Sequence, residues 1–153
     1  VPFVPPRAFL PDGVTNYVTP QGMQQLLEEK NTLLQEKELL NGENERELRI
    51  ARNHSHANMS LLQVRIGTSV VVNLEEQPKD IIRFGATVEL INEADGALNT
   101  YQIVGVEEAN ASQGKVSFIS PLSSLLMGKK VGDTFVLKLP KGEKKLKVTS
   151  IDY

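Results

Sequence analysis

The sequence predicts an α+β protein in which an antiparallel helical hairpin precedes a small sheet domain. Leucines recur seven residues apart between residues 20 and 40, apolar residues spaced by threes and fours follow to residue 66, and apolar and polar residues alternate from residue 70 onward. The first two patterns are typical of amphipathic helices, and the third of half-buried strands. We therefore expect a lead-in over residues 1–18, a hairpin over 19–69 and a sheet domain over 70–153.

The lead-in contains four prolines within its first eleven residues. Proline fixes φ and lacks a backbone N–H, so it disfavours both helix and strand ladders. An extended or polyproline II conformation is therefore expected for this segment.

The first helix is expected to begin at Thr19-Pro20, where a capping hydroxyl precedes proline at the first helical position. Leu26, Leu33 and Leu40 follow at heptad spacing, with Leu27 and Leu34 beside them, while lysines occupy the second core column at positions 30 and 37. Buried lysine weakens such a seam, so we expect a hairpin within one chain rather than a long coiled coil between chains.

A short connection at Asn41-Gly42 should end the first helix, since both residue types tolerate the left-handed conformation. The second helix is predicted from Leu48, Arg52, Ser55, Met59, Leu62 and Ile66, with Gly67 closing it. Two amphipathic helices with so short a connection should fold back on each other. A first helix of residues 20–40 would extend roughly 31 Å.

The C-terminal half is expected to form an antiparallel sheet wrapped around one short helix. Ser120 caps this helix, Pro121 begins it and Gly128 ends it. Residues 75–80 are the expected boundary region between the two parts. The strands are predicted at residues 87–91, 100–104, 115–119, 135–139 and 146–148, separated by glycine-containing turns.

Composition excludes several classes of protein. The chain has no cysteine, which removes disulfides, thiol catalysis and cysteine-ligated zinc. Its net charge of −2 argues against binding nucleic acid through bulk positive charge. Apolar runs such as residues 70–72 are too short to span a bilayer, so we expect no membrane association and a cytoplasmic protein. His54 and His56 lie on different helix faces, so no metal site is expected.

Several motifs, in this order and spacing, resemble the Gre family of transcription elongation factors. The resemblance is specific over about residues 83–153, architectural across the hairpin, and does not cover residues 1–14. The motifs are Asn16-Tyr17-Val18-Thr19-Pro20-Gln21-Gly22, Arg83-Phe84-Gly85-Ala86-Thr87-Val88, Tyr101-Gln102-Ile103-Val104-Gly105-Val106-Glu107-Glu108-Ala109, Ser117-Phe118-Ile119-Ser120-Pro121-Leu122, Leu126-Met127-Gly128-Lys129-Lys130-Val131-Gly132-Asp133 and Leu139-Pro140-Lys141-Gly142-Glu143.

The resemblance implies an FKBP-like sheet domain that holds the rim of the secondary channel of bacterial RNA polymerase, while the helical arm enters the channel. It implies an accessory factor rather than an enzyme, with nascent RNA and DNA contacted only through the elongation complex. In family members that stimulate cleavage, acidic residues at the arm tip help to bind a second Mg²⁺ in the polymerase active site, where the metal generates the nucleophile.

The expected arm tip departs from the family pattern. Glu43-Asn44 matches the family motif, but Leu40 stands three residues earlier, where the family has aspartate. Glu45 and Glu47 are candidate substitutes, although glutamates at a helix start are also ordinary dipole partners. The arm is shorter than usual by roughly four turns of about 5.4 Å each. By resemblance we therefore expect a factor that modulates elongation or the rescue of backtracked complexes, and the alternative is a non-cleaving inhibitor or regulator of the polymerase. The two departures favour a non-cleaving modulator over one that stimulates cleavage. The chain is expected to bind no cofactor by itself, and Mg²⁺ only if the tip shares the polymerase metal.

Two further surfaces are candidates for binding. Arg46, Arg49 and Arg52 are three residues apart and should form a basic ridge. By resemblance this ridge faces RNA, while pairing with glutamates of the first helix is the alternative. By resemblance, too, the sheet domain docks on the polymerase around Ser120, Pro121 and Leu122, with Lys129 and Lys130 as candidate basic contacts. A helix cap and a solubilising charge are the respective alternatives.

Two other functions were weighed. An FKBP-like sheet suggests a prolyl isomerase, but such a site needs an aromatic-lined pocket, and this chain has no Trp and only eight Phe and Tyr together. The hairpin could also serve a dimeric adaptor. Because lysines interrupt the leucine seam, we expect a monomer.

Overall fold

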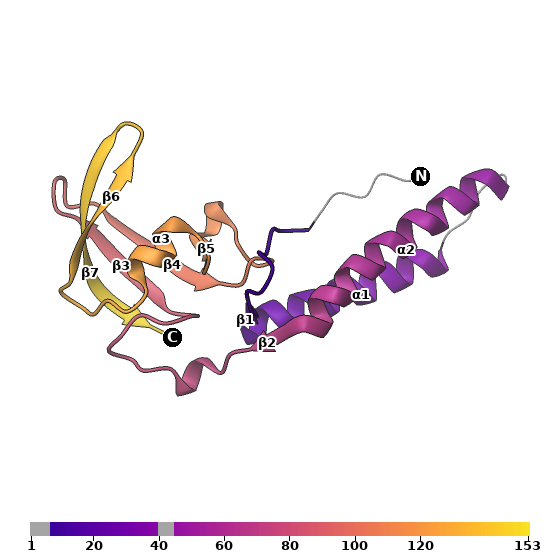
Figure 1. The fold of residues 1–153 in the computed structure, drawn as a ribbon, viewed down its shortest axis with the longest axis horizontal. Helices are drawn as coiled ribbons and strands as arrows, with labels where there is room; N and C mark the ends of the chain where they lie inside the picture. The colour runs from indigo at the N-terminus through magenta and orange to yellow at the C-terminus, as the bar shows by residue number, and fades with distance from the viewer. Residues whose placement is uncertain (1–6, 40–44) are drawn as a thin grey trace.

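The computed structural model describes residues 7–39 and 45–153, and it divides into a helical arm and a sheet domain (Figure 1). The arm and its base consist of β1 (Asn16–Val18), α1 (Pro20–Glu38), α2 (Glu45–Thr68) and β2 (Ser69–Val71). A 3-10 turn, η1 (Leu74–Glu76), leads to the sheet domain. That domain contains β3 (Thr87–Asn92), β4 (Leu98–Val104), η2 (Ala111–Gln113), β5 (Lys115–Ser117), α3 (Pro121–Leu126), β6 (Thr134–Leu139) and β7 (Gly142–Asp152). The predicted α+β class is confirmed.

Helix α1 begins as its sequence predicts. The Thr19 hydroxyl accepts a hydrogen bond from the Gly22 N–H at 3.0 Å, and Pro20 occupies the first turn. Leu26 is buried against Val18 and Leu62, with Leu33 packed beside them, so the helices do pack on each other. Leu27 and Leu34 remain 48% and 44% exposed, so the second leucine column is not part of this seam. Leu40, Asn41 and Gly42 lie outside the described residues.

Helix α2 does not close at Gly67, and that prediction is wrong. Gly67 is not among the described residues with positive φ, and the helix runs on to Thr68. The Thr68 hydroxyl donates to the Val64 carbonyl oxygen at 2.8 Å, and the Ser69 hydroxyl donates to that of Arg65. Side-chain hydroxyls thus satisfy carbonyls of the last turn, and no left-handed glycine is needed there.

A two-stranded parallel sheet forms the base of the arm. Strand β1, from the end of the predicted lead-in, pairs with β2, and Tyr17 lies opposite Val70. The side-chain amide of Asn16 donates to the Arg65 carbonyl oxygen at 3.0 Å. The segments before α1 and after α2 are therefore held together at the end of the arm nearest the sheet domain (Figure 1).

The sheet domain is a five-stranded sheet in the order β5-β4-β3-β7-β6. Three of its four strand pairs are antiparallel as predicted, but β5 pairs parallel with β4. Residues 105–114 lead the chain from the end of β4 back to a point beside Gln102, where β5 begins. Strand β5 can therefore run in the same direction as β4. Strand β5 is also shorter than predicted and ends at Ser117, whereas β7 is longer and reaches Asp152.

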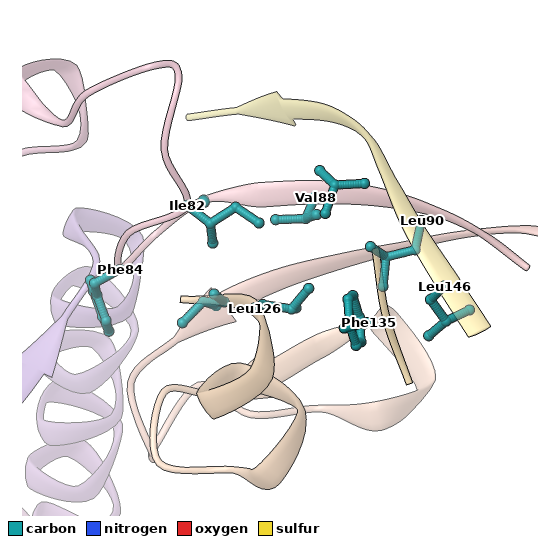
Figure 2. Packing of buried hydrophobic residues seen from close by; sticks show 10 residues of the cluster. Ile82, Phe84, Val88, Leu90, Leu126, Phe135 and Leu146 are labelled. Atoms are coloured by element: carbon teal, nitrogen blue, oxygen red, sulfur yellow. The ribbon is translucent and has the colours of Figure 1, made fainter. Parts of the chain in front are cut away.

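The core of the sheet domain lies between α3 and the sheet (Figure 2). Leu126 of α3 is fully buried and belongs to one cluster with Val88 and Leu90 of β3, Phe135 of β6 and Leu146 of β7. Ser120 caps α3 through a hydrogen bond from the Ser123 N–H at 3.2 Å, and Gly128 follows with a φ of 86°. The predicted start and end of this helix are confirmed.

Among the described helices, none is both long enough and apolar enough to cross a membrane.

Candidate functional site

The far end of the arm carries two of the three predicted tip carboxylates within the described residues. Glu45 and Glu47 both lie in the first turn of α2 and are exposed, while Glu43 lies outside the described residues. Residues two apart on a helix do not face each other. The structure therefore does not bring Glu45 and Glu47 together on one side of the arm.

The predicted basic ridge lies on α2. Arg46, Arg49 and Arg52 are all exposed, and across residues 7–39 and 45–153 no salt bridge joins any of the three to an acidic side chain. Six residues of helix separate the outer two, a rise of about 9 Å. The alternative pairing with glutamates of α1 is not observed within that part of the chain. The ridge thus presents three positive charges to solvent.

A network of serines builds the start of α3. The Ser123 hydroxyl is fully buried and donates to the Ser117 carbonyl oxygen at 2.6 Å, while the Ser120 hydroxyl lies 3.0 Å from that of Ser123. These bonds fix the turn that presents Pro121 on the surface and Leu122 at its edge. Ser120 therefore has a structural role, whatever else it contacts.

Lys129 and Lys130 lie beyond the other end of α3, a helix of six residues that is about 9 Å long. The Lys129 ammonium lies 5.6 Å from the ring centre of Phe135, and the backbone N–H of Lys130 donates to Asp133 at 2.8 Å. Val131 next to them is 57% exposed. The predicted docking residues therefore bracket α3, and sequence reasoning missed the exposed apolar side chain beside the lysines.

The arm and the sheet domain meet at Glu108, a buried carboxylate of the loop after β4. It accepts hydrogen bonds from the Thr19 N–H at 3.1 Å, from the Thr19 hydroxyl, and from the Gly105 N–H at 3.0 Å. A carboxylate at the first residues of α1 also interacts favourably with the helix dipole. The carboxylate of Glu108, from the sheet domain, thus lies at the start of helix α1 of the arm.

Arg7 forms a second connection between the two parts. Its guanidinium donates to Glu29 of α1 at 2.9 and 2.7 Å and to Glu107 at 3.0 and 3.0 Å. The hydrogen bonds to Glu29 raise the pKa of Arg7, those to Glu107 raise it further, and burial opposes both. Arg7 is therefore charged at any pH at which the protein is folded.

Three aromatic rings close the same junction. Tyr17 of β1 lies 5.8 Å from Phe84 and 5.7 Å from Phe118, and the latter two rings are 5.6 Å apart. Such tilted and edge-on pairs are favourable arrangements. Three of the eight aromatic residues thus pack on each other where the arm meets the sheet domain.

No spacing in the sequence pointed to Arg7, Glu29, Glu107 and Glu108 as a set, because Arg7 and Glu107 are a hundred residues apart. The motifs that resemble the Gre family include Glu107 and Glu108, and this resemblance was the only signal for two of the four residues. In the part of the chain that the structure describes, no three His, Asp or Glu side chains are grouped so that they could hold a metal ion.

The sheet domain matches a known family. The family model for the transcription elongation factor GreA/GreB C-terminal domain matches residues 77–153, half of the chain. The transcription elongation factor GreA of Sinorhizobium medicae is 35% identical over 103 residues, which cover 67% of this chain and 65% of that protein. That of Rhodospirillum rubrum is 41% identical over 83 residues, or 54% of this chain and 53% of that protein.

The chain thus spans just under two thirds of the length of the first of these relatives. Among solved structures, that of GreA factor homolog 1 (Gfh1) from Thermus thermophilus is 23% identical with a TM-score of 0.45. The alignment covers 92% of this chain and 100% of that one.

Proposed function

This chain belongs to the GreA/GreB family of transcription elongation factors, and from that premise we propose that it binds bacterial RNA polymerase at the secondary channel and modulates elongation without stimulating transcript cleavage. The sheet domain holds the channel rim and the arm enters the channel. The protein is an accessory to the polymerase and has no active site of its own.

The observation that carries this proposal is the family match over residues 77–153, because it includes the whole of α3 and the lysines after it. Pro121 and Lys130 are exposed on either side of α3, and Val131 adds an apolar side chain. An exposed apolar group flanked by charge is a usual composition for a protein-binding surface.

The geometry of the arm tip supports modulation rather than cleavage. A second Mg²⁺ needs carboxylate oxygens that converge on one point. Glu45 and Glu47 are two residues apart on α2 and diverge, and Leu40 replaces the family aspartate. Helix α1 has 19 residues and is about 29 Å long. An arm of this length extends less far into the channel than the usual arm of the family, which is longer by roughly four turns of about 5.4 Å each.

The basic ridge has a place in the same proposal. Arg46, Arg49 and Arg52 lie on the arm that enters the channel, where the displaced 3′ end of a backtracked RNA carries phosphates. Phosphate attraction would then stabilise the bound arm in a salt-dependent way.

Binding to core polymerase tests the proposal directly. The protein, free in solution, should bind core polymerase at low salt, and affinity should fall as salt is raised. Lys130→Glu should weaken binding because it reverses a charge beside α3. Lys141→Glu is the matched control, since Lys141 is also exposed and lies in the turn between β6 and β7, away from α3 (Figure 1).

No binding of the wild-type protein at low salt would overturn the proposed function. Binding that is equally strong in Lys130→Glu and Lys141→Glu would keep the function and remove Lys130 from the docking surface.

Cleavage stimulation is the second candidate, and the glutamates at positions 43, 45 and 47 favour it. It requires the Glu45 or Glu47 side chain to reach the polymerase metal together with Glu43. Release of short 3′ RNA fragments from a backtracked complex separates it from modulation.

A further inference from the structure

The N-terminal strap, defined here as residues 7–15, crosses from the arm to the sheet domain at the junction. Arg7 of the strap forms paired hydrogen bonds with both Glu29 of α1 and Glu107 of the loop after β4. Its side chain is only 18% exposed and that of Glu107 only 8%, so this contact is largely removed from water. A guanidinium that pairs two oxygens at a time fixes direction as well as distance.

Helix α2 adds a second cation to the same carboxylate. The Arg65 Nε lies 3.6 Å from Glu107, and another nitrogen of its guanidinium donates to the Ala8 carbonyl oxygen. The strap is therefore held at its backbone by α2, while its side chain holds α1 and the sheet domain. Two separate parts of the chain, the strap and α2, thus converge on Glu107.

This cluster differs from the ordinary surface ion pair. An exposed pair contributes little because water screens it and both side chains lose freedom. Here the charges of Arg7 and Arg65 face those of Glu107 and Glu29 in a partly dry site, so loss of one partner leaves another charge buried without compensation. The arrangement in which Arg7 bridges Glu29 and Glu107 is therefore favoured over orientations that separate these two carboxylates.

The Glu108 contact alone would not fix the orientation of the arm. It joins the sheet domain to the first residues of α1, and the ring of Tyr17, just before that helix, packs on Phe84 and Phe118, so these contacts all lie at one end of the arm and permit rotation about that end. Arg7 grips α1 at Glu29, ten residues further along the helix. A second contact away from the first removes that rotational freedom.

We propose that Arg7 is a positioning residue that locks the angle between the arm and the sheet domain. The lock itself does not depend on the proposed function. The role of the lock in polymerase binding does rest on the proposed function, because a sheet domain bound to the polymerase directs the arm into the channel only if the angle between the two is fixed. The strap lies outside the region matched by the family model, so this lock is a feature that the family match does not assign.

The chain has no cysteine, which makes site-directed spin labelling direct. Labels at Glu36→Cys on α1 and Asn99→Cys on β4 lie on opposite parts, and both positions are exposed. Pulsed dipolar spectroscopy on the full chain, free in solution, then reports the distribution of distances between arm and sheet domain. We expect one narrow distance in the wild-type background.

The variants are Arg7→Gln and Glu29→Gln. Each should broaden or shift the distance distribution, and the double variant should add little to either, since all act on one contact. Arg83→Gln is the matched control, because Arg83 is exposed and no salt bridge within the described residues involves it. Glu29 is 43% exposed, so Glu29→Gln leaves folding intact even if Arg7→Gln unfolds the chain.

A distribution in Glu29→Gln that coincides with the wild type would overturn the lock. A second measurement compares the variants for polymerase binding and for their effect on elongation. Arg7→Gln should retain binding through the sheet domain and lose its effect on elongation, an outcome that general destabilisation would not produce. If the wild type fails to bind polymerase while Glu29→Gln still broadens the distances, the proposed function is wrong and the lock stands.

Discussion

Gly22 and Gly67 both lie within helices, but their surroundings differ. A Cβ at Gly22 would overlap with the Glu108 carboxylate, whereas a Cβ at Gly67 would meet no atom within 4 Å. Gly22 therefore makes room for the contact between the arm and the sheet domain. Gly67 has no such role, which fits its failure to end α2.

These two glycines give a matched pair of predictions. Gly22→Ala should lower the free energy of unfolding by about 1–3 kcal/mol, because Glu108 must give up its hydrogen bonds to Thr19 and Gly105. Gly67→Ala should raise it by about 0.5–1 kcal/mol, because alanine is the better helix former. Urea unfolding of both variants is the measurement, and stabilisation by Gly22→Ala would contradict the close approach.

Tyr153 ties the C-terminus to the segment before β3. Its hydroxyl donates to the Ile81 carbonyl oxygen at 2.7 Å and accepts from the Arg83 N–H at 2.8 Å. Burial raises the pKa of this phenol, although the hydrogen bond from Arg83 opposes the shift. The neutral phenol is therefore the form that the folded state favours.

Tyr153→Phe should cost about 1 kcal/mol of stability at neutral pH. The unfolded chain loses the phenol proton near the ordinary tyrosine pKa of about 10, before the folded protein does. The stabilisation by the neutral phenol is thus complete below about pH 10. It is lost as the pH rises from there through the higher pKa of the folded protein. Unfolding free energies between about pH 9 and 11 should fall less steeply in Tyr153→Phe than in the wild type. Equal slopes would show that Tyr153 is not favoured in its neutral form.

At the scale of elements, the arm uses only part of its apolar pattern. Leu62 of α2 is fully buried against Val18 and Leu26, while its neighbour Leu61 is 41% exposed. The heptad spacing predicted which helices pair, and it could not predict that Leu27 and Leu34 would remain outside the seam. That depends on the tilt of α2 against α1, which a pattern in one helix does not fix.

Adjacent leucines of α2 test the packing of the arm. Leu62→Ala should lower the free energy of unfolding by about 2–5 kcal/mol, because it leaves a cavity at the base of the arm. Leu61→Ala should change it by less than about 0.5 kcal/mol, as usual for a surface position. Thermal or urea unfolding checks both, and similar losses in the two variants would contradict the orientation of α2.

The sheet domain was the more predictable element. Ser120, Pro121 and Gly128 bounded α3 correctly, since caps and helix stops act within a few residues of sequence. The parallel pairing of β4 with β5 was missed, because strand direction is set by where the connection returns the chain and not by the alternation within a strand. Local signals predicted the elements, and longer-range geometry decided their pairing.

At the scale of the whole molecule, the junction was beyond sequence reasoning. Arg7 in the strap, Glu29 in the arm and Glu107 in the sheet domain come together only in the fold. The tip and ridge residues could be predicted as a set because they are close in sequence. The predicted Glu43 lies outside the described residues, while Glu45 and Glu47 diverge on α2.

Within the described residues, the molecule has a short arm joined to the sheet domain through the Arg7 contacts, and Glu45 and Glu47 do not converge. Under the proposed function, such a molecule should alter elongation by occupying the channel. It should not deliver a metal to the polymerase active site. The central claim is therefore binding and modulation without cleavage.

A backtracked elongation complex supplied with Mg²⁺ and this protein tests the claim most directly. We expect no release of short 3′ RNA fragments above that of polymerase alone, together with a changed rate of resumed elongation that Arg46→Glu/Arg49→Glu/Arg52→Glu reduces. Fragment release that rises with the protein and disappears in Glu43→Gln/Glu45→Gln/Glu47→Gln would contradict the account.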